Sequence, residues 1–252
     1  MGVAIITGAQ RGMGKAIALA LAEAGYDIAA ADLQMSPQLD DVVNQCRARG
    51  VKALGFACNI GELASHARVL DEIEVALGAV TTLVNNAGVS VKARGDLLDV
   101  TPDSYDHCLN INTRGTFFLT QAFAKRLRDS VTTCHRSIIN ITSANASAVS
   151  ITRGEYCISK AGASMMSKLF AARLSDEDIG VYEVQPGFID TEMVAPSKAK
   201  YDALIEGGLT VIRRFGKPEE VARIVVTLAN GLLPYTSGQA IQADGGLLCV
   251  RY

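Results

Sequence analysis

A glycine-rich turn lies between the first predicted strand and the first predicted helix, and it limits the possible folds more than any other feature. Residues 3–7, Val-Ala-Ile-Ile-Thr, form a short apolar run typical of a buried strand, and a helical run begins at Lys15. Gly8, Gly12 and Gly14 separate the two. A strand, a glycine turn and a helix in this order predict an α/β fold with a dinucleotide site at the turn.

The glycine turn supplies the first candidate cofactor residues. Glycines let the backbone turn tightly and approach a pyrophosphate, whose charge the amides and dipole of the following helix stabilise. We therefore expect cofactor contacts from Gly8, Arg11, Gly12, Met13 and Gly14. A plain turn with a glycine cap is the alternative, and the flanking strand and helix disfavour it.

The same alternation of strand and helix continues along the chain. Further strands are predicted at 27–32, 52–57, 80–85, 137–142, 180–185 and 239–242, and further helices at 37–49, 62–77, 101–128, 154 onward and 218–230. With 252 residues, 49% of them hydrophobic, the chain suits one domain over residues 1–252. We predict a Rossmann-type three-layer sandwich: a seven-stranded parallel sheet, order 3-2-1-4-5-6-7, with three helices on each face.

An acidic residue, Asp32, ends the second predicted strand. It follows Gly14 at close to the roughly 20-residue spacing at which a carboxylate accepts hydrogen bonds from an adenosine ribose. Leu33 and Gln34 add no positive charge that would favour the extra phosphate of NADP. Asp32 and Leu33 are therefore predicted to contact NAD, although Asp32 could also be an ordinary turn residue.

Tyr156 and Lys160 lie one helical turn apart and project from one face if the segment is helical. A lysine cation nearby favours the phenolate, which makes Tyr156 a candidate proton carrier. Ser143 follows a predicted strand, and a hydroxyl at the carboxyl end of a strand points into the crevice where α/β sheets bind ligands. A tyrosine and a lysine at this spacing also occur on solvated helix faces, so the case depends on the accompanying motifs.

Those motifs make the chain resemble the short-chain dehydrogenase/reductase family over nearly its whole length. They are Thr-Gly-x-x-x-Gly-x-Gly at 7–14, Asn-Asn-Ala-Gly at 85–88, Tyr-x-x-x-Lys at 156–160 and Asp-Gly-Gly at 244–246. The resemblance implies reversible hydride transfer between a nicotinamide and a carbinol carbon. In it Tyr156 takes the alcohol proton, Lys160 assists and binds the nicotinamide ribose, and Ser143 donates a hydrogen bond to the substrate oxygen.

The resemblance also implies roles for residues outside the Tyr-Lys motif. Asn112, in Asn-Thr-Arg-Gly at 112–115, would hold a water that passes protons to Lys160, with Asn110 as the neighbouring alternative. Asn59, at a place where the family usually has aspartate, would contact adenine beside Ile60. The remaining implied cofactor contacts are Asn86, Ala87 and Gly88 at the ribose, and Pro186, Gly187, Ile189 and Thr191 at the nicotinamide.

The substrate is expected to contact Ser143, Asn145, Arg153 and Tyr156. Arg153 precedes Tyr156 by three residues and would bind an anionic or polyhydroxylated molecule; a solvated charge near Glu155 is the alternative. Residues 187–215, which include Pro196, mix apolar and charged residues without a clean period and are the predicted substrate lid.

Charge and composition limit the other partners. A net charge of -2 gives no broad basic face for nucleic acid or an anionic membrane. No apolar run is long enough to span a bilayer and no leader is evident, so we expect a cytoplasmic protein. The six cysteines are scattered without metal-ligand spacing, and no metal is expected.

A homotetramer is expected from apolar and small residues on two predicted helices. They are Phe117, Phe118 and Phe123, and Ala161, Gly162, Ala163, Met165 and Met166. The resemblance pairs these helices across a two-fold axis and implies a second interface at the C-terminal segment 247–252. Core packing of some of these residues is the alternative.

The predicted function is NAD(H)-dependent interconversion of a secondary alcohol and a ketone, with a sugar, a polyol or a hydroxy acid as substrate. The alternative enzyme is an NADPH-dependent 3-oxoacyl-carrier-protein reductase; Asp32 argues against it and Arg11 leaves room for it. A catalytically silent nucleotide-binding protein of the same fold is the alternative of another class. The complete set of Asn112, Ser143, Tyr156 and Lys160 disfavours that alternative.

Overall fold

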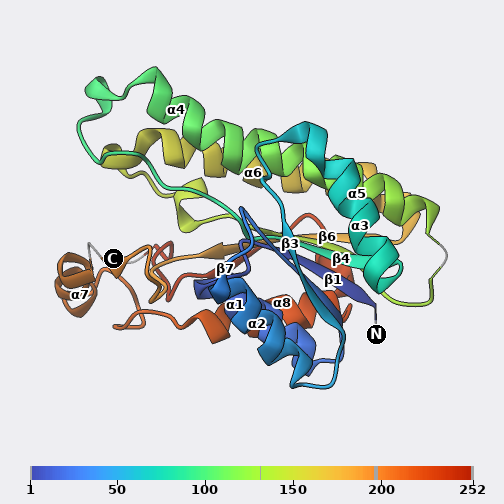
Figure 1. Cartoon of the computed structure of the whole chain (residues 1–252). Helices are drawn as coiled ribbons and strands as arrows, with labels where there is room; N and C mark the ends of the chain where they lie inside the picture. Colours follow the sequence, from blue (N-terminus) through green and yellow to red (C-terminus); the bar gives the residue numbers. More distant parts are fainter. Residues whose placement is uncertain (1, 131, 196–197, 251–252) are drawn as a thin grey trace.

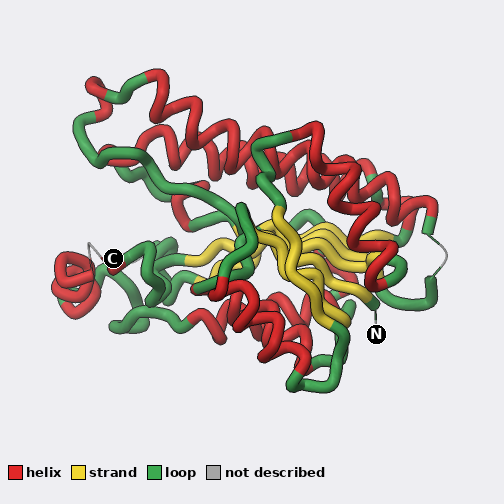
Figure 2. Tube along the Cα trace, in the orientation of Figure 1, coloured by secondary structure: helices red, strands yellow, loops and turns green. Residues whose placement is uncertain are grey.

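The computed structural model describes residues 2–130, 132–195 and 198–250. Within these ranges a parallel sheet of seven strands forms the middle layer (Figures 1 and 2). The strands are β1 (Val3–Thr7), β2 (Asp27–Asp32), β3 (Ala53–Ala57), β4 (Val80–Asn85), β5 (Arg136–Ile141), β6 (Ile179–Pro186) and β7 (Ala240–Ala243). Their order, β3-β2-β1-β4-β5-β6-β7, confirms the prediction and puts a topological switch between β1 and β4.

Helices cover both faces of the sheet (Figure 1). One face carries α1 (Gly12–Glu23), α2 (Pro37–Arg47) and α8 (Pro218–Ala229), and the other carries α3 (His66–Leu77), α5 (Thr116–Asp129) and α6 (Gly154–Arg173). The remaining helices are α4 (Pro102–Leu109), which precedes α5, and α7 (Lys198–Glu206) in the predicted lid. No helix within the described ranges combines the length and apolar character needed to cross a membrane.

Two apolar cores lie on opposite faces of the sheet, and successive residues of β1 alternate between them. Ile6 packs in the core that contains Ile17 of α1 and Val225 of α8. Ile5 packs in the core that contains Leu119 of α5 and Phe170 of α6. Because both faces of the sheet are buried, β1 is a continuous apolar run. The carboxyl ends of the strands stay uncovered by the helices, and ligands can bind there.

The helical region predicted at 101–128 is confirmed, but its middle is not regular α-helix. A π-helical segment, η3 (Asn110–Gly115), separates α4 from α5. Here the Thr116 hydroxyl donates to the Ile111 carbonyl at 3.3 Å, and the Thr113 hydroxyl donates to the Ser159 carbonyl of α6 at 2.9 Å. Contacts with α6 therefore override the regular helical repeat, as often happens at functional sites.

Some residues predicted at subunit interfaces belong to the core instead. Phe123 and Met166 pack in the core beneath α5 and α6, and Ala163 of α6 is also buried. Phe118 and Met165 are 39% and 53% exposed and remain available to a partner. Pro196 of the predicted lid and residues 251–252 of the C-terminal segment lie outside the described residues.

Candidate active site

A cavity of about 440 Å³ lies where the chain leaves β1, β2, β3 and β4. Predicted cofactor residues line it: Gly8, Arg11, Gly12, Met13, Gly14, Asp32, Leu33, Asn59, Ile60, Asn86, Ala87, Gly88 and Thr191. Other residues that line it were not predicted as cofactor contacts, including Gln10, Cys58, Val89, His107 and Glu192. Burial raises the pKa of the Cys58 thiol to about 11, so this thiol is uncharged at neutral pH. We call this space the cofactor cavity.

The glycine turn fits a dinucleotide pyrophosphate. Gly8 has a φ of +66°, and a Cβ on Gly14 would lie 2.0 Å from the Gly8 carbonyl oxygen, so a side chain is excluded there. Within the described residues no side chain caps the start of α1, and its first turn contains no acid. Its first amides are therefore open to an anion.

Asp32 holds its carboxylate at the edge of the cofactor cavity. The carboxylate accepts hydrogen bonds from the backbone amides of Gln10 at 3.0 Å and Leu33 at 2.8 Å, and the residue is only 8% exposed. Carboxylate oxygens have further lone pairs, so these bonds leave acceptors for ribose hydroxyls. The residues of this edge therefore fit the adenosine ribose of NAD.

Both cations near this edge are already paired with acids. Arg11 of the glycine turn lies 3.0 Å from Glu192 of the predicted lid, and Lys15 lies 2.9 Å from Asp41. A phosphate on the ribose would meet the Asp32 carboxylate and two neutralised cations.

Two predicted asparagine contacts serve the local backbone. The Asn86 amide nitrogen donates to the carbonyls of Thr7 at 2.9 Å and Gly8 at 3.1 Å, which braces the glycine turn. The Asn59 amide oxygen accepts from the Gly61 amide at 3.0 Å. The ribose contact of Asn86 and the adenine contact of Asn59 stay predictions.

A second cavity, of about 300 Å³, adjoins the first and shares Met13, Thr191 and Met193 with it. All four predicted substrate residues and all four predicted nicotinamide contacts line it: Ser143, Asn145, Arg153, Tyr156, Pro186, Gly187, Ile189 and Thr191. Lining residues that the sequence analysis did not select include Ser90, Arg94 and Tyr201. We call it the substrate cavity.

Ser143 and Tyr156 bring two hydroxyl groups to the substrate cavity. Ser143 caps the short helix η4 (Ala144–Ala146), and its Oγ accepts from the Asn145 amide at 3.1 Å. Tyr156 lies in the first turn of α6. Across the described parts of the chain, neither hydroxyl donates to a protein acceptor, so both can hydrogen-bond to a bound molecule.

Lys160 lies one turn along α6 from Tyr156, as the spacing requires. Its ammonium is 5.8 Å from the Tyr156 ring centroid and donates to the Ile141 carbonyl at 3.1 Å. A Cβ on Gly88 would come within 3.5 Å of this ammonium. Lys160 is therefore buried between the end of β5 and the loop after β4, behind Tyr156.

Asn112 ties the loop after β4 to α6. Its amide nitrogen donates to the Val89 carbonyl and to Ser159 Oγ, both at 2.9 Å, and its amide oxygen accepts from the Val89 amide at 2.8 Å. The π-helical segment η3 presents Asn112 to both elements. The water predicted to link Asn112 to Lys160 stays a prediction.

Two arginines give the substrate cavity a positive charge. Arg153 ends the short helix η5 (Ile151–Arg153), and its Nη2 donates to the Asn145 amide oxygen at 2.6 Å. Arg94, in the loop after β4, donates to the Tyr201 hydroxyl of α7 at 3.0 Å. Arg94 follows the strand predicted at 80–85, and ligands bind at the carboxyl ends of such strands, so this position could have identified Arg94 from the sequence.

Comparison with known proteins identifies the family. A family model described as Enoyl-(Acyl carrier protein) reductase matches residues 8–248. The chain is 33% identical over 98% of its length to a 3-oxoacyl-(acyl-carrier-protein) reductase of Thermotoga maritima, and covers 97% of that protein. The chain belongs to the short-chain dehydrogenase/reductase family. It is therefore an oxidoreductase that acts on a carbinol or ketone carbon.

Solved structures of short-chain dehydrogenases/reductases share the fold along the whole chain. A 3-oxoacyl-(acyl-carrier-protein) reductase from Brucella melitensis in complex with NAD has a TM-score of 0.96 and 40% identity, over 100% of this chain and 98% of that one. A short-chain type dehydrogenase/reductase from Mycobacterium marinum has a TM-score of 0.91 and 33% identity, over 99% and 96%. Both agree with the seven-stranded Rossmann-type sheet described above.

Proposed function

We propose that this short-chain dehydrogenase/reductase interconverts a 3-hydroxyacyl and a 3-oxoacyl compound with NAD(H). The observation that carries the proposal is the junction of the two cavities, where Ser143 and Tyr156 line one side and Asp32 marks the far edge of the other. Bound NAD supplies the acceptor for a hydride at this junction.

The names of relatives support the 3-oxoacyl skeleton. Besides the two 3-oxoacyl reductases, an acetoacetyl-CoA reductase of Shinella zoogloeoides is 32% identical over 97% of this chain. A putative 2-deoxy-D-gluconate 3-dehydrogenase from Agrobacterium tumefaciens with bound NADP has a TM-score of 0.85 and 28% identity. These names share chemistry at the third carbon of an acid or of its thioester. They favour the 3-oxoacyl chemistry of the alternative placed second in the sequence analysis over a simple sugar or polyol, and they leave the group at the acyl end open.

The catalytic roles are assigned to Tyr156, Lys160, Ser143 and Asn112. Tyr156 accepts the proton of the substrate hydroxyl, and the buried ammonium of Lys160 lies 5.8 Å from the Tyr156 ring centroid. The unused hydrogen of Ser143 stabilises the substrate oxygen as charge develops on it. Asn112 fixes the loop after β4 against α6 and supports the proton path to Lys160.

NAD rather than NADP is proposed as the cofactor. The restrained carboxylate of Asp32 and the paired states of Arg11 and Lys15 support this choice. The relatives point in both directions, because the Brucella melitensis reductase was solved with NAD and the Agrobacterium tumefaciens dehydrogenase with NADP.

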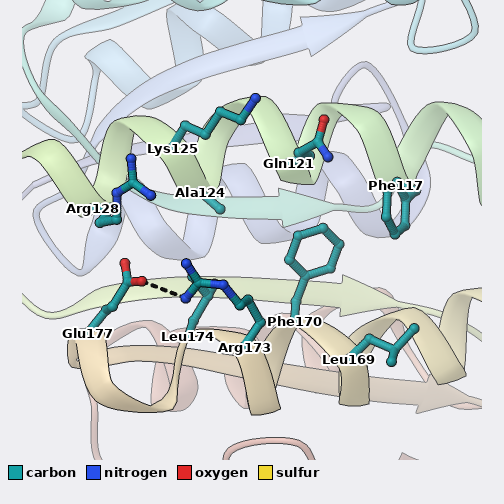
Figure 3. A pocket seen from close by; sticks show the side chains of 10 residues that line it. All are labelled: Phe117, Gln121, Ala124, Lys125, Arg128, Leu169, Phe170, Arg173, Leu174 and Glu177. Atoms are coloured by element: carbon teal, nitrogen blue, oxygen red, sulfur yellow. Dashed lines mark hydrogen bonds and ion pairs between the residues drawn. The ribbon is translucent and has the colours of Figure 1, made fainter.

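Residues 1–252 are proposed to form one NAD(P)-binding domain, with 187–215 as its lid, in a cytoplasmic homotetramer. A groove of about 430 Å³ between α5 and α6 supports the assembly (Figure 3). Phe117 and Phe170 point toward one another in it, with ring centroids 5.2 Å apart, and Leu169 beside them is 57% exposed. A second copy would cover this apolar surface in a two-fold interface.

A direct assay tests the proposed reaction. The purified protein is mixed with NAD and with 3-hydroxybutyrate as the free acid, the amide and the N-acetylcysteamine thioester, and formation of NADH is followed. We expect NADH to form with at least one of the three compounds. Failure of all three, with both NAD and NADP, would overturn the proposed reaction.

A further inference from the structure

The substrate cavity has a marked excess of positive charge. Arg94 and Arg153 both line it, and no aspartate or glutamate lines it within the described parts of the chain. The chain as a whole has a net charge of -2, so this excess is local. Neither arginine forms a salt bridge with a described acidic residue.

Arg153 has a donor that the protein leaves without a partner. Its Nε is buried and, among the described residues, has no hydrogen-bond acceptor. Its only side-chain hydrogen bond given by the described atoms runs from Nη2 to the neutral amide oxygen of Asn145. A buried donor on a charged group is costly when it is unsatisfied, so an acceptor supplied by a ligand would offset that cost.

Arg153 also lies close to the reacting group. Its guanidinium carbon is 5.1 Å from the ring centroid of Tyr156. A small molecule whose hydroxyl reaches Tyr156 can therefore reach Arg153 with a group only a few bonds away. The planar donors of a guanidinium match the two oxygens of a carboxylate.

Arg94 brings a second guanidinium from a different segment. The Tyr201 hydroxyl of α7 holds it at 3.0 Å, and Tyr201 itself packs on Phe188 with ring centroids 4.6 Å apart. This bond uses Nη1 and leaves the other donors of Arg94 for a ligand. The contact joins the loop after β4 to the predicted lid, so ordering of the lid helps to orient Arg94.

We propose that Arg153 and Arg94 bind the free carboxylate of the substrate, so that the site accepts a 3-hydroxy or 3-oxo acid as the anion. The inference rests on the proposed function and adds which group the substrate carries at its acyl end, namely a free carboxylate. A thioester or an amide presents only a neutral carbonyl to the two guanidinium groups, whereas a carboxylate carries the opposite charge and has two oxygens that can accept from one guanidinium in a bidentate pair. The acid is therefore favoured over both.

The test compares 3-hydroxybutyrate, 3-hydroxybutyramide and the N-acetylcysteamine thioester of 3-hydroxybutyrate with NAD. We expect kcat/KM for the acid to exceed that of each neutral form by at least about tenfold. Arg153→Gln should lower kcat/KM for the acid by about tenfold or more and leave the amide nearly unchanged. Arg153→Lys should retain part of the preference in kcat/KM for the acid over the amide, and Arg94→Gln should reduce that preference. Arg68→Gln on α3 is the matched control and should leave the preference unchanged.

A binding measurement separates this inference from the proposed reaction. Acetoacetate and acetoacetamide are titrated calorimetrically into the complex with oxidised NAD, where neither can be reduced. Tighter binding of acetoacetate, lost in Arg153→Gln, supports the carboxylate site even if no 3-hydroxybutyryl compound turns over. Equal binding of the two, or a thioester turned over as efficiently as the acid, overturns the inference; in the second case the proposed reaction stands.

Discussion

Arg11 and Glu192 form an ion pair of 3.0 Å between the glycine turn and the predicted lid, and both residues line the cofactor cavity. Glu192 thereby pairs with Arg11, the cation of the glycine turn that could otherwise meet a phosphate on the adenosine ribose. Glu192→Gln should therefore release Arg11 and raise kcat/KM for NADP by about two- to fivefold, the range expected for an exposed pair. Efficiency with NAD should change little. Glu206→Gln, an exposed acid on α7, is the control, and an unchanged ratio of NADP to NAD efficiency would contradict the role of Glu192.

Asp32 is expected to set the cofactor preference. The additional ribose phosphate of NADP beside the Asp32 carboxylate costs on the order of 1 to 4 kcal/mol, so NAD should be preferred by at least about tenfold in kcat/KM. Asp32→Ala should narrow this preference, mainly by improving NADP. Asp32→Asn keeps one acceptor oxygen, which serves the amide of Gln10 or of Leu33, and controls for loss of the negative charge without loss of the side chain. Equal efficiency of the two cofactors in the parent protein would remove Asp32 from this role.

Tyr156→Phe should abolish turnover and leave NAD binding nearly intact. The substitution removes the proposed proton acceptor and keeps the ring that packs 5.1 Å from the Arg153 guanidinium. Single-turnover rates and cofactor titrations measure the two effects separately. Tyr105→Phe removes a phenolic oxygen from the partly exposed face of α4 and should behave as the parent. Near-normal turnover in Tyr156→Phe would exclude the proposed mechanism.

The groove between α5 and α6 is expected to be a subunit interface. Leu169→Glu places a charge in this groove, where burial against a second copy would be costly, and should lower the mass measured by light scattering. Val75→Glu introduces the same charge at an 89% exposed apolar residue of α3 and should leave the tetramer intact. A monomeric parent protein, or a Leu169→Glu variant with the parental mass, would contradict the assignment.

Glu220 is expected to make stability depend on acid pH. The Arg214 side chain and the Lys217 amide lower the pKa of Glu220 to about 2, from a usual value of 4.5. Its stabilising contribution is therefore present above about pH 4.5 and is lost as the pH falls toward 2. The side chains of Arg214 and Glu220 are both partly exposed, so we expect the pair to contribute less than about 1 kcal/mol to the free energy of unfolding.

Urea unfolding of Glu220→Gln at several pH values measures this contribution. The difference from the parent should shrink between pH 4.5 and 2, over the range in which Glu220 itself is protonated. Glu219→Gln changes the neighbouring acid in the first turn of α8 and should show a smaller dependence on pH. A constant difference at every pH would show that charge pairing with Arg214 contributes nothing.

The sequence by itself determined the buried first strand, the glycine turn and the spacing of Tyr156 and Lys160. Each of these follows from local order along the chain: a buried strand, a tight turn with Gly8 at positive φ, and two residues one helical turn apart. Such features depend on neighbouring residues, so a pattern of residue types is enough to predict them.

Only the tertiary structure decided which side chains complete the two cavities. Glu192 meets Arg11 across 181 residues, and Tyr201 meets Arg94 across 107. The π-helical segment at Asn110–Gly115 likewise depends on packing against α6. The burial of the Phe123 side chain depends on packing of α5 against the sheet. Contacts between distant segments are fixed by how helices and loops pack on the sheet, and no local pattern of residues specifies them.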